Sequence, residues 1–148
     1  MALPEILPHL GHRNWVAVVD AAFPELVAPG VTTLVGGSLE STVDALNASA
    51  HIRYEVLIDA ELEFLQEPDC PGIEAFRCRL DRLLEEMPVV RQPHDEIIKT
   101  IEAVAGTFRV VVVKTDCLLP YTSVFFRLGC GYWGTVQEAE LRSRMPSV

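Results

Sequence analysis

Short apolar runs rich in β-branched residues alternate along the chain with stretches in which apolar residues recur every three or four positions. The runs predict strands at 15–19, 31–35, 52–58, 89–91, 108–113 and 123–128. The helical spacing predicts helices at 4–10, 39–50, 73–87 and 94–105, and the polar tail from about residue 137 predicts a frayed helix. Because strands and helices alternate with few hairpin signals, the sequence predicts one α/β domain over residues 1–148. We expect a three-layer α/β/α sandwich with a mostly parallel or mixed central sheet.

Composition narrows the partners that this domain can have. The net charge of −9 argues against a nucleic acid or an anionic membrane surface, and the 12 Lys and Arg residues form no run. No apolar stretch approaches the ~20 residues of a membrane span, and residues 1–10 lack the charged-then-apolar pattern of a signal sequence. We therefore expect a cytoplasmic protein. The negative net charge does not argue against binding of a neutral ligand.

Several kinds of site are disfavoured by the spacing of their characteristic residues. The four cysteines contain no CxxC pair and are expected to be unpaired thiols rather than metal ligands: Cys70, Cys78, Cys117 and Cys130. No histidine is spaced to activate Cys117 as a nucleophile. Gly36-Gly37 lacks the Gly-x-Gly-x-x-Gly pattern of a nucleotide loop, so we expect a strand-to-helix turn with Ser38 as the N-cap.

The stretch from Gly11 to Pro24 places a titratable residue at each end of the first predicted strand. His12 precedes the apolar run 15–19, and Asp20 follows it. Histidine side chains titrate near neutral pH, and a carboxylate accepts hydrogen bonds or holds a charge. Eight extended residues span up to ~26 Å, so the two side chains do not meet within one straight copy. A shared site therefore requires a bend in the chain or a neighbouring copy.

This stretch resembles the opening signature of the L-fucose mutarotase and D-ribose pyranase family. The family carries Gly-His and then Asp-Ala-x-x-Pro, with the aspartate eight residues after the histidine, and Gly11-His12 and Asp20-Ala21 keep that spacing. Phe23 before the proline is closer to the fucose branch than to the ribose branch.

The resemblance continues in the second half of the chain. His94, followed by an acid and Ile97, resembles the ribose-type pattern, and Thr115 and Tyr121 keep the spacing of the family's threonine and tyrosine. The main departure is Ser123, which stands where the family has an asparagine. Asparagine offers two donors and an acceptor on a longer arm, and serine does not reproduce both contacts.

The resemblance implies a cofactor-free mutarotase that opens and recloses a monosaccharide ring by acid–base catalysis. It assigns the proton carrier to His12 and contacts with the sugar to Asp20, His94, Tyr121 and Ser123. Each residue also has a structural alternative: a helix-end contact for His12, a turn for Asp20, a helix start for His94 and a core phenol for Tyr121. A D-ribose pyranase, a sugar-binding relative without turnover and an enzyme acting on another substrate all remain open.

Assembly is the last expectation from the sequence. The resemblance implies pentamers paired into decamers, with sites between adjacent subunits. Phe125, Phe126, Tyr132 and Trp133 place large side chains near the end of the chain, where a small monomer would not readily bury them all. We therefore expect a homo-oligomer larger than a dimer.

Overall fold

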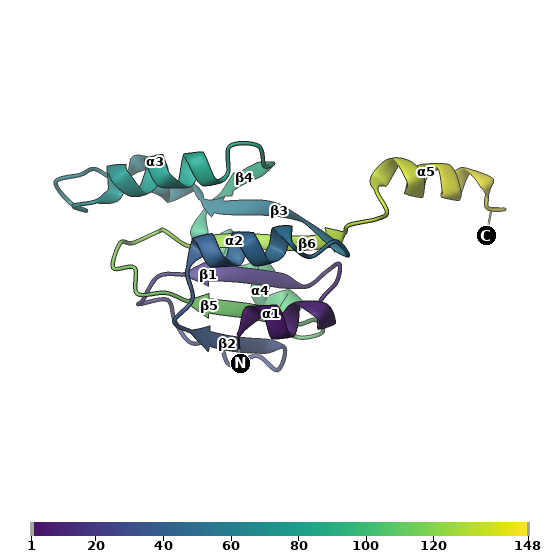
Figure 1. The fold of residues 1–148 in the computed structure, drawn as a ribbon, viewed down its shortest axis with the longest axis horizontal. Helices are drawn as coiled ribbons and strands as arrows, with labels where there is room; N and C mark the ends of the chain where they lie inside the picture. The colour runs from purple at the N-terminus through teal and green to yellow at the C-terminus, as the bar shows by residue number, and fades with distance from the viewer. Residues whose placement is uncertain (1, 148) are drawn as a thin grey trace.

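A single mixed sheet lies between two layers of helices in the computed structural model, which describes residues 2–147 (Figure 1). The strands have the order β2-β5-β1-β6-β3-β4 and comprise β1 (Trp15–Val19), β2 (Val31–Val35), β3 (Ile52–Asp59), β4 (Val89–Gln92), β5 (Val110–Lys114) and β6 (Val124–Cys130). The helices are α1 (Leu3–Ile6), α2 (Leu39–Asn47), α3 (Ile73–Leu83), α4 (His94–Ala105) and α5 (Thr135–Arg144), with short 3₁₀ turns η1 (Leu7–His9) and η2 (Ala60–Phe64). The predicted fold class is confirmed.

Strand direction decides which residues can meet. β1 and β2 run parallel to β5, β3 runs parallel to β4, and β6 lies antiparallel between β1 and β3. The carboxyl ends of the parallel strands and the amino end of β6 therefore share one edge of the sheet, which we call the carboxyl edge. The opposite edge, where β1 begins and β6 ends, is called the amino edge.

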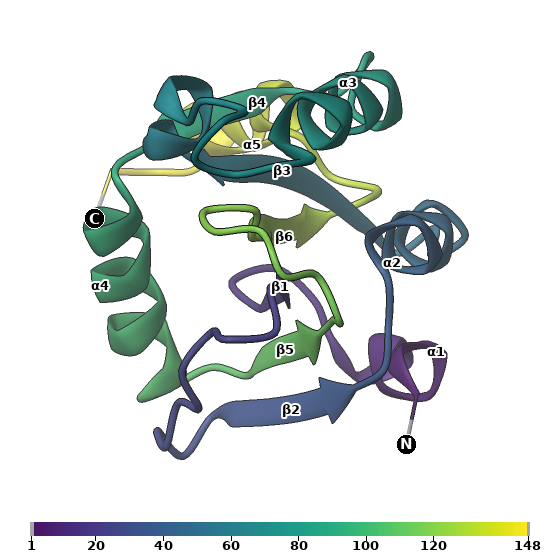
Figure 2. The ribbon, with the colours of Figure 1, turned by 90° about the vertical axis from the view of Figure 1, so that its left-hand side faces the viewer.

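Two apolar cores fill the space on either side of the sheet. Helices α1, α2 and α3 cover one face and α4 covers the other (Figure 2). Successive residues of β1 contribute to opposite cores, with Val16 and Val18 on one face and Trp15 and Ala17 on the other. Full burial of an aliphatic or aromatic side chain contributes ~1.5–3 kcal/mol, so this doubly covered strand is a main source of stability.

Local signals in the sequence account for most element boundaries. Ser38 caps α2 as predicted, because its Oγ accepts a hydrogen bond from the backbone N–H of Ser41 at 3.1 Å. A Cβ at Gly37 would lie 2.3 Å from a methyl group of Val113, so the double glycine allows close packing of the strand-to-helix turn. The third helix ends at Leu83, four residues earlier than the apolar spacing predicts. In the described part of the chain, no helix combines the length and the apolar character needed to cross a membrane.

The C-terminal helix α5 projects from the body of the molecule beyond the amino edge (Figure 1). None of its residues is buried, and Tyr132 and Trp133 at its base are 78% and 41% exposed. Phe125 and Phe126 are fully buried within the same chain, one in each core. The argument for an oligomer from these two phenylalanines is therefore wrong, because β6 lies inside the sheet. Of these four aromatic residues, Tyr132 and Trp133 leave apolar surface exposed.

Candidate functional site at the carboxyl edge

The carboxyl edge brings together residues from distant parts of the sequence. Asp20 follows β1, and Ser123 directly precedes β6. Because Val124 pairs with Val18 of β1 and also with Ile58 of β3, Ser123 lies between the ends of those two strands. Its Oγ donates a long hydrogen bond of 3.4 Å to Asp20 Oδ1. Ser123 is only 1% exposed, so its hydroxyl group holds the Asp20 side chain in position and is itself hardly accessible to solvent.

His94 is the first residue of α4 and is held by contacts to its backbone and to its ring. The backbone N–H donates to both carboxylate oxygens of Glu61, at 3.0 and 3.2 Å, and this contact caps the helix. The ring Nδ1 lies 2.9 Å from Asp59 Oδ1. Phe23 and Tyr121 meet the imidazole edge-on, with ring centroids 6.3 and 5.8 Å away. The imidazole is thus fixed in position while a quarter of the side chain stays exposed.

Asp59 is a residue of this cluster that the sequence analysis missed. It ends β3 and is 1% exposed, and its Oδ2 is buried without a hydrogen-bond partner in the described structure. Burial raises the pKa of Asp59 to about 6; the hydrogen bond and charge of His94 lower it, and the carboxylates of Glu61 and Asp20 raise it. The available signal was a carboxylate closing an apolar strand, the same pattern that singled out Asp20.

Tyr121 completes the cluster from the loop between β5 and β6. Its backbone has a φ of 57°, in the left-handed region that residues with a Cβ adopt at a cost of roughly 1 kcal/mol. The side chain is 39% exposed and stands beside His94. A core phenol, the structural alternative for this residue, does not fit that exposure.

His12 is the one predicted site residue that lies elsewhere. It is exposed at the amino edge, where it contributes to a cleft of about 460 Å³ with Arg53 and Arg127 and to a second of about 520 Å³ beside Trp133. The neighbouring Arg13 has a φ of 76°, so the turn before β1 is also strained. One chain therefore unites Asp20, His94, Tyr121 and Ser123 but leaves His12 at the other end of the sheet.

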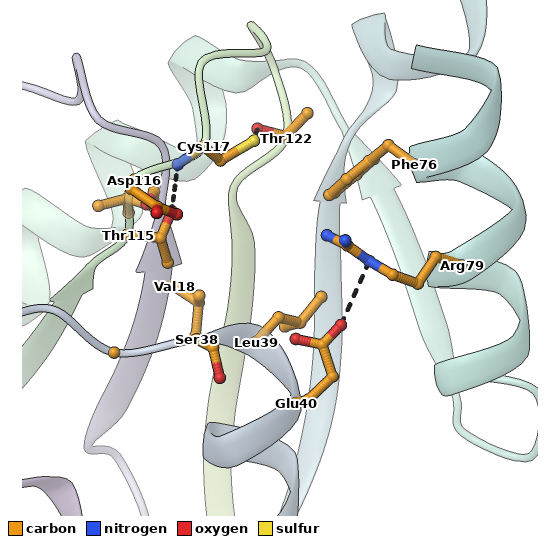
Figure 3. Close-up of a pocket in the computed structure, with 12 residues that line it drawn as sticks. Val18, Ser38, Leu39, Glu40, Phe76, Arg79, Thr115, Asp116, Cys117 and Thr122 are labelled. Carbon is orange, nitrogen blue, oxygen red and sulfur yellow. Dashed lines mark hydrogen bonds and ion pairs between the residues drawn. The ribbon is translucent and has the colours of Figure 1, made fainter. Parts of the chain in front are cut away.

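A cavity of about 150 Å³ lies between α2 and α3, on the face of the sheet opposite to the one that α4 covers (Figure 3). Arg79 of α3 pairs with Glu40 of α2 across it at 3.2 Å. Cys117 lines this cavity, with its Sγ 3.5 Å from Thr122 Oγ1, and no histidine is among the lining residues. The cavity thus supplies no histidine to activate the Cys117 thiol, and none of the predicted site residues lines it.

The chemistry available at the carboxyl edge is hydrogen bonding around one imidazole. Asp20 offers acceptors, Tyr121 offers a hydroxyl group, and the Nε2 of His94 takes part in no hydrogen bond within residues 2–147. No group of three or more potential metal ligands occurs in the described residues. Such a set matches the hydroxyl groups of a polar, uncharged ligand.

Comparison with known proteins finds similarity in structure alone. No model of a protein family and no curated protein sequence matches the chain. Bacillus subtilis RbsD complexed with D-ribose superposes with a TM-score of 0.60 and 21% identity, covering 86% of this chain and 90% of RbsD. The chain has the RbsD fold. The fucose mutarotase of Streptococcus pneumoniae in complex with L-fucose shares it, with a TM-score of 0.51 and 14% identity over 86% of this chain and 90% of that one. The RbsD fold is the fold that the motifs around His12 and Asp20 predict.

Proposed function

We propose that this chain is a cofactor-free monosaccharide mutarotase, which interconverts the anomers or ring forms of a sugar such as L-fucose. The observation that carries the proposal is the carboxyl edge, where Asp20, His94, Tyr121 and Ser123 converge from three separate segments. Two proteins of the same fold are described in complex with D-ribose and with L-fucose, which supports a monosaccharide as the ligand.

The reaction needs only a proton acceptor and a proton donor. A base takes the proton of the anomeric hydroxyl, and the electron pair left on that oxygen forms the carbonyl bond. The bond between the anomeric carbon and the ring oxygen breaks, and an acid protonates the ring oxygen to give the open-chain aldehyde. Rotation about the exposed carbon followed by the reverse steps gives the other anomer. A different hydroxyl attacking the carbonyl gives another ring size.

We assign the proton carrier to His12 and the orientation of the sugar to the carboxyl edge. Because His12 lies at the amino edge of its own chain, the proposed site takes its His12 from an adjacent copy. Asp20 and Tyr121 hold sugar hydroxyls, which lowers the entropy cost of reaching the reactive geometry. His94 provides a further contact beside Tyr121.

A D-ribose pyranase and a sugar-binding protein without turnover are the alternatives. His94 followed by an acid fits the ribose-type pattern, and binding without turnover is favoured by Ser123. The serine hydroxyl is buried against Asp20 and does not replace both contacts of the family's asparagine.

Saturation-transfer NMR tests the proposal directly, because it measures the exchange between two anomers at equilibrium. One anomeric proton of L-fucose, D-ribose or another monosaccharide is saturated, and the loss of signal at the other is recorded with and without the protein. We expect accelerated exchange for at least one sugar. Sugar binding in the same spectra without faster exchange would favour the binding protein, and neither effect across pentoses, hexoses and deoxyhexoses would contradict the proposal.

A further inference from the structure

Two acids from one short segment hold His94 in place. Asp59 ends β3 and Glu61 lies two residues later in η2. Glu61 accepts both of its hydrogen bonds from the backbone of His94, whereas Asp59 contacts the ring at Nδ1. The junction between β3 and η2 therefore fixes the position of the helix start and, separately, the orientation of the imidazole.

We propose that Asp59 is a positioning residue that holds His94 in the tautomer with a proton on Nδ1, so that the unprotonated Nε2 accepts a hydrogen bond or a proton from a sugar hydroxyl. This inference rests on the proposed function and extends it. It makes His94 a proton acceptor at the carboxyl edge, in addition to the His12 of an adjacent copy.

The geometry determines which nitrogen carries the proton. An ionised carboxylate only accepts hydrogen bonds, so the 2.9 Å contact with Asp59 Oδ1 requires a hydrogen on Nδ1. The neutral imidazole carries one N–H, which leaves a lone pair on Nε2. Phe23 and Tyr121 stand edge-on to the ring and restrict its rotation. The lone pair is therefore held in a fixed direction.

The burial of Asp59 argues against a purely structural role. A buried carboxylate oxygen without a partner is costly, and Oδ2 of Asp59 has none among the described residues. An asparagine or a serine would also accept a hydrogen bond from Nδ1 without bringing a charge into the core. A carboxylate stabilises the Nδ1–H form, and also the imidazolium that arises when Nε2 takes a proton, more strongly than a neutral acceptor.

The surroundings of Asp59 determine the pH range over which its side chain is ionised. His94 faces it from α4, Glu61 from η2 and Asp20 from the end of β1. Because the pKa of Asp59 is raised to about 6, the carboxylate form dominates above that pH. Below it, a protonated Asp59 no longer offers Nδ1–H a charged acceptor.

Long-range ¹H–¹⁵N correlation spectra of the full chain at pH 8, labelled with ¹⁵N-histidine and without sugar, test the inference. The chain has four histidines, and the signals of His94 are those lost in His94→Gln. We expect wild-type His94 to be protonated on Nδ1 and unprotonated on Nε2. In Asp59→Ala, which removes the acceptor, we expect the Nε2–H form to appear. In Asp59→Asn, whose amide oxygen still accepts from Nδ1 but carries no charge, we expect a smaller gain of that form. Asp95→Asn, which removes an exposed carboxylate from the same helix start, should leave the wild-type pattern.

An Nε2–H form in the wild type at pH 8, or a wild-type pattern in both Asp59 variants, would overturn the inference. The alanine variant keeps the test valid if the buried amide of asparagine prevents folding or still accepts from Nδ1. Because the spectra need no turnover, they are independent of the anomer-exchange experiment. A chain with the expected tautomer and no accelerated exchange would refute the proposed function while retaining the role of Asp59 in orienting His94.

Discussion

His12 and Asp20 lie at opposite ends of β1, so a single copy of the chain holds them at opposite edges of its sheet. A site that uses both residues therefore needs two copies. We expect light scattering of the dilute protein to give a mass more than twice that of the 16.4 kDa chain. A monomer mass together with full activity would exclude a site shared between subunits.

A mixed-variant experiment tests the shared site more directly. His12→Ala and Tyr121→Phe are each expected to be inactive alone, because one removes the proposed proton carrier and the other a hydroxyl that holds the sugar. Co-assembled from a denatured mixture, the two variants should recover part of the exchange activity, because some sites then combine an intact His12 with an intact Tyr121. No recovery in verified mixed oligomers would place both residues in the same subunit's site.

Replacing His12 should reduce turnover without unfolding the protein, because the side chain is exposed. We expect His12→Ala to lower anomer exchange on the order of 10²-fold or more, the usual contribution of a general acid or base. His9→Ala is the matched control, since His9 is also exposed and lies outside the motif. The assignment of His12 fails if the two variants exchange anomers equally fast.

Ser123→Asn introduces the residue that the L-fucose mutarotase and D-ribose pyranase family, which the sequence resembles, carries at this position. If an asparagine there contacts the sugar, the variant should raise activity toward L-fucose or D-ribose. The site is buried beside Asp20, so the larger side chain should also lower the free energy of unfolding by ~1–3 kcal/mol. Rates and urea unfolding curves separate the two effects. Lower activity toward every sugar would indicate a pocket rebuilt for a different ligand.

The raised pKa of Asp59 predicts how stability depends on pH. Its folded-state pKa of about 6 lies above the ordinary value of 3.8, so the folded protein binds this proton more tightly than the unfolded chain does. Wild-type stability should therefore fall relative to that of Asp59→Asn as the pH rises from about 4 to 6, and the difference should then stay constant. Two pKa units correspond to at most ~3 kcal/mol. Urea unfolding at pH 5 and pH 8 measures the change, and an unchanged difference would contradict it.

Most of the fold follows from local patterns in the sequence. β1 and β2 begin and end at the predicted residues, because each is an apolar run bounded by polar or turn residues. α4 begins at His94 as predicted, since Pro93 and the acids after it mark a helix start. The predicted cap at Ser38 is also formed.

The arrangement of the site depends on pairing between distant strands, which local patterns do not determine. Asp20 lies 103 residues before Ser123 in the sequence, and only the antiparallel insertion of β6 between β1 and β3 makes them neighbours. The same pairing buries Phe125 and Phe126, which the sequence analysis left for a subunit interface. Asp59 was missed because the predicted strand ended one residue earlier, at Ile58.

The position of β6 also constrains how the protein can fold during synthesis. β6 is the last in chain order of the six described strands, yet it pairs with β1 and β3 near the middle of the sheet. Until residues 124–130 leave the ribosome, both of those strands present unpaired N–H and C=O groups to any other chain nearby. A chain truncated before β6 would thus contain two separate sheets, β2-β5-β1 and β3-β4. The unpaired strands β1 and β3 would be exposed edges that are open to aggregation, although both lie inside the sheet of the complete fold.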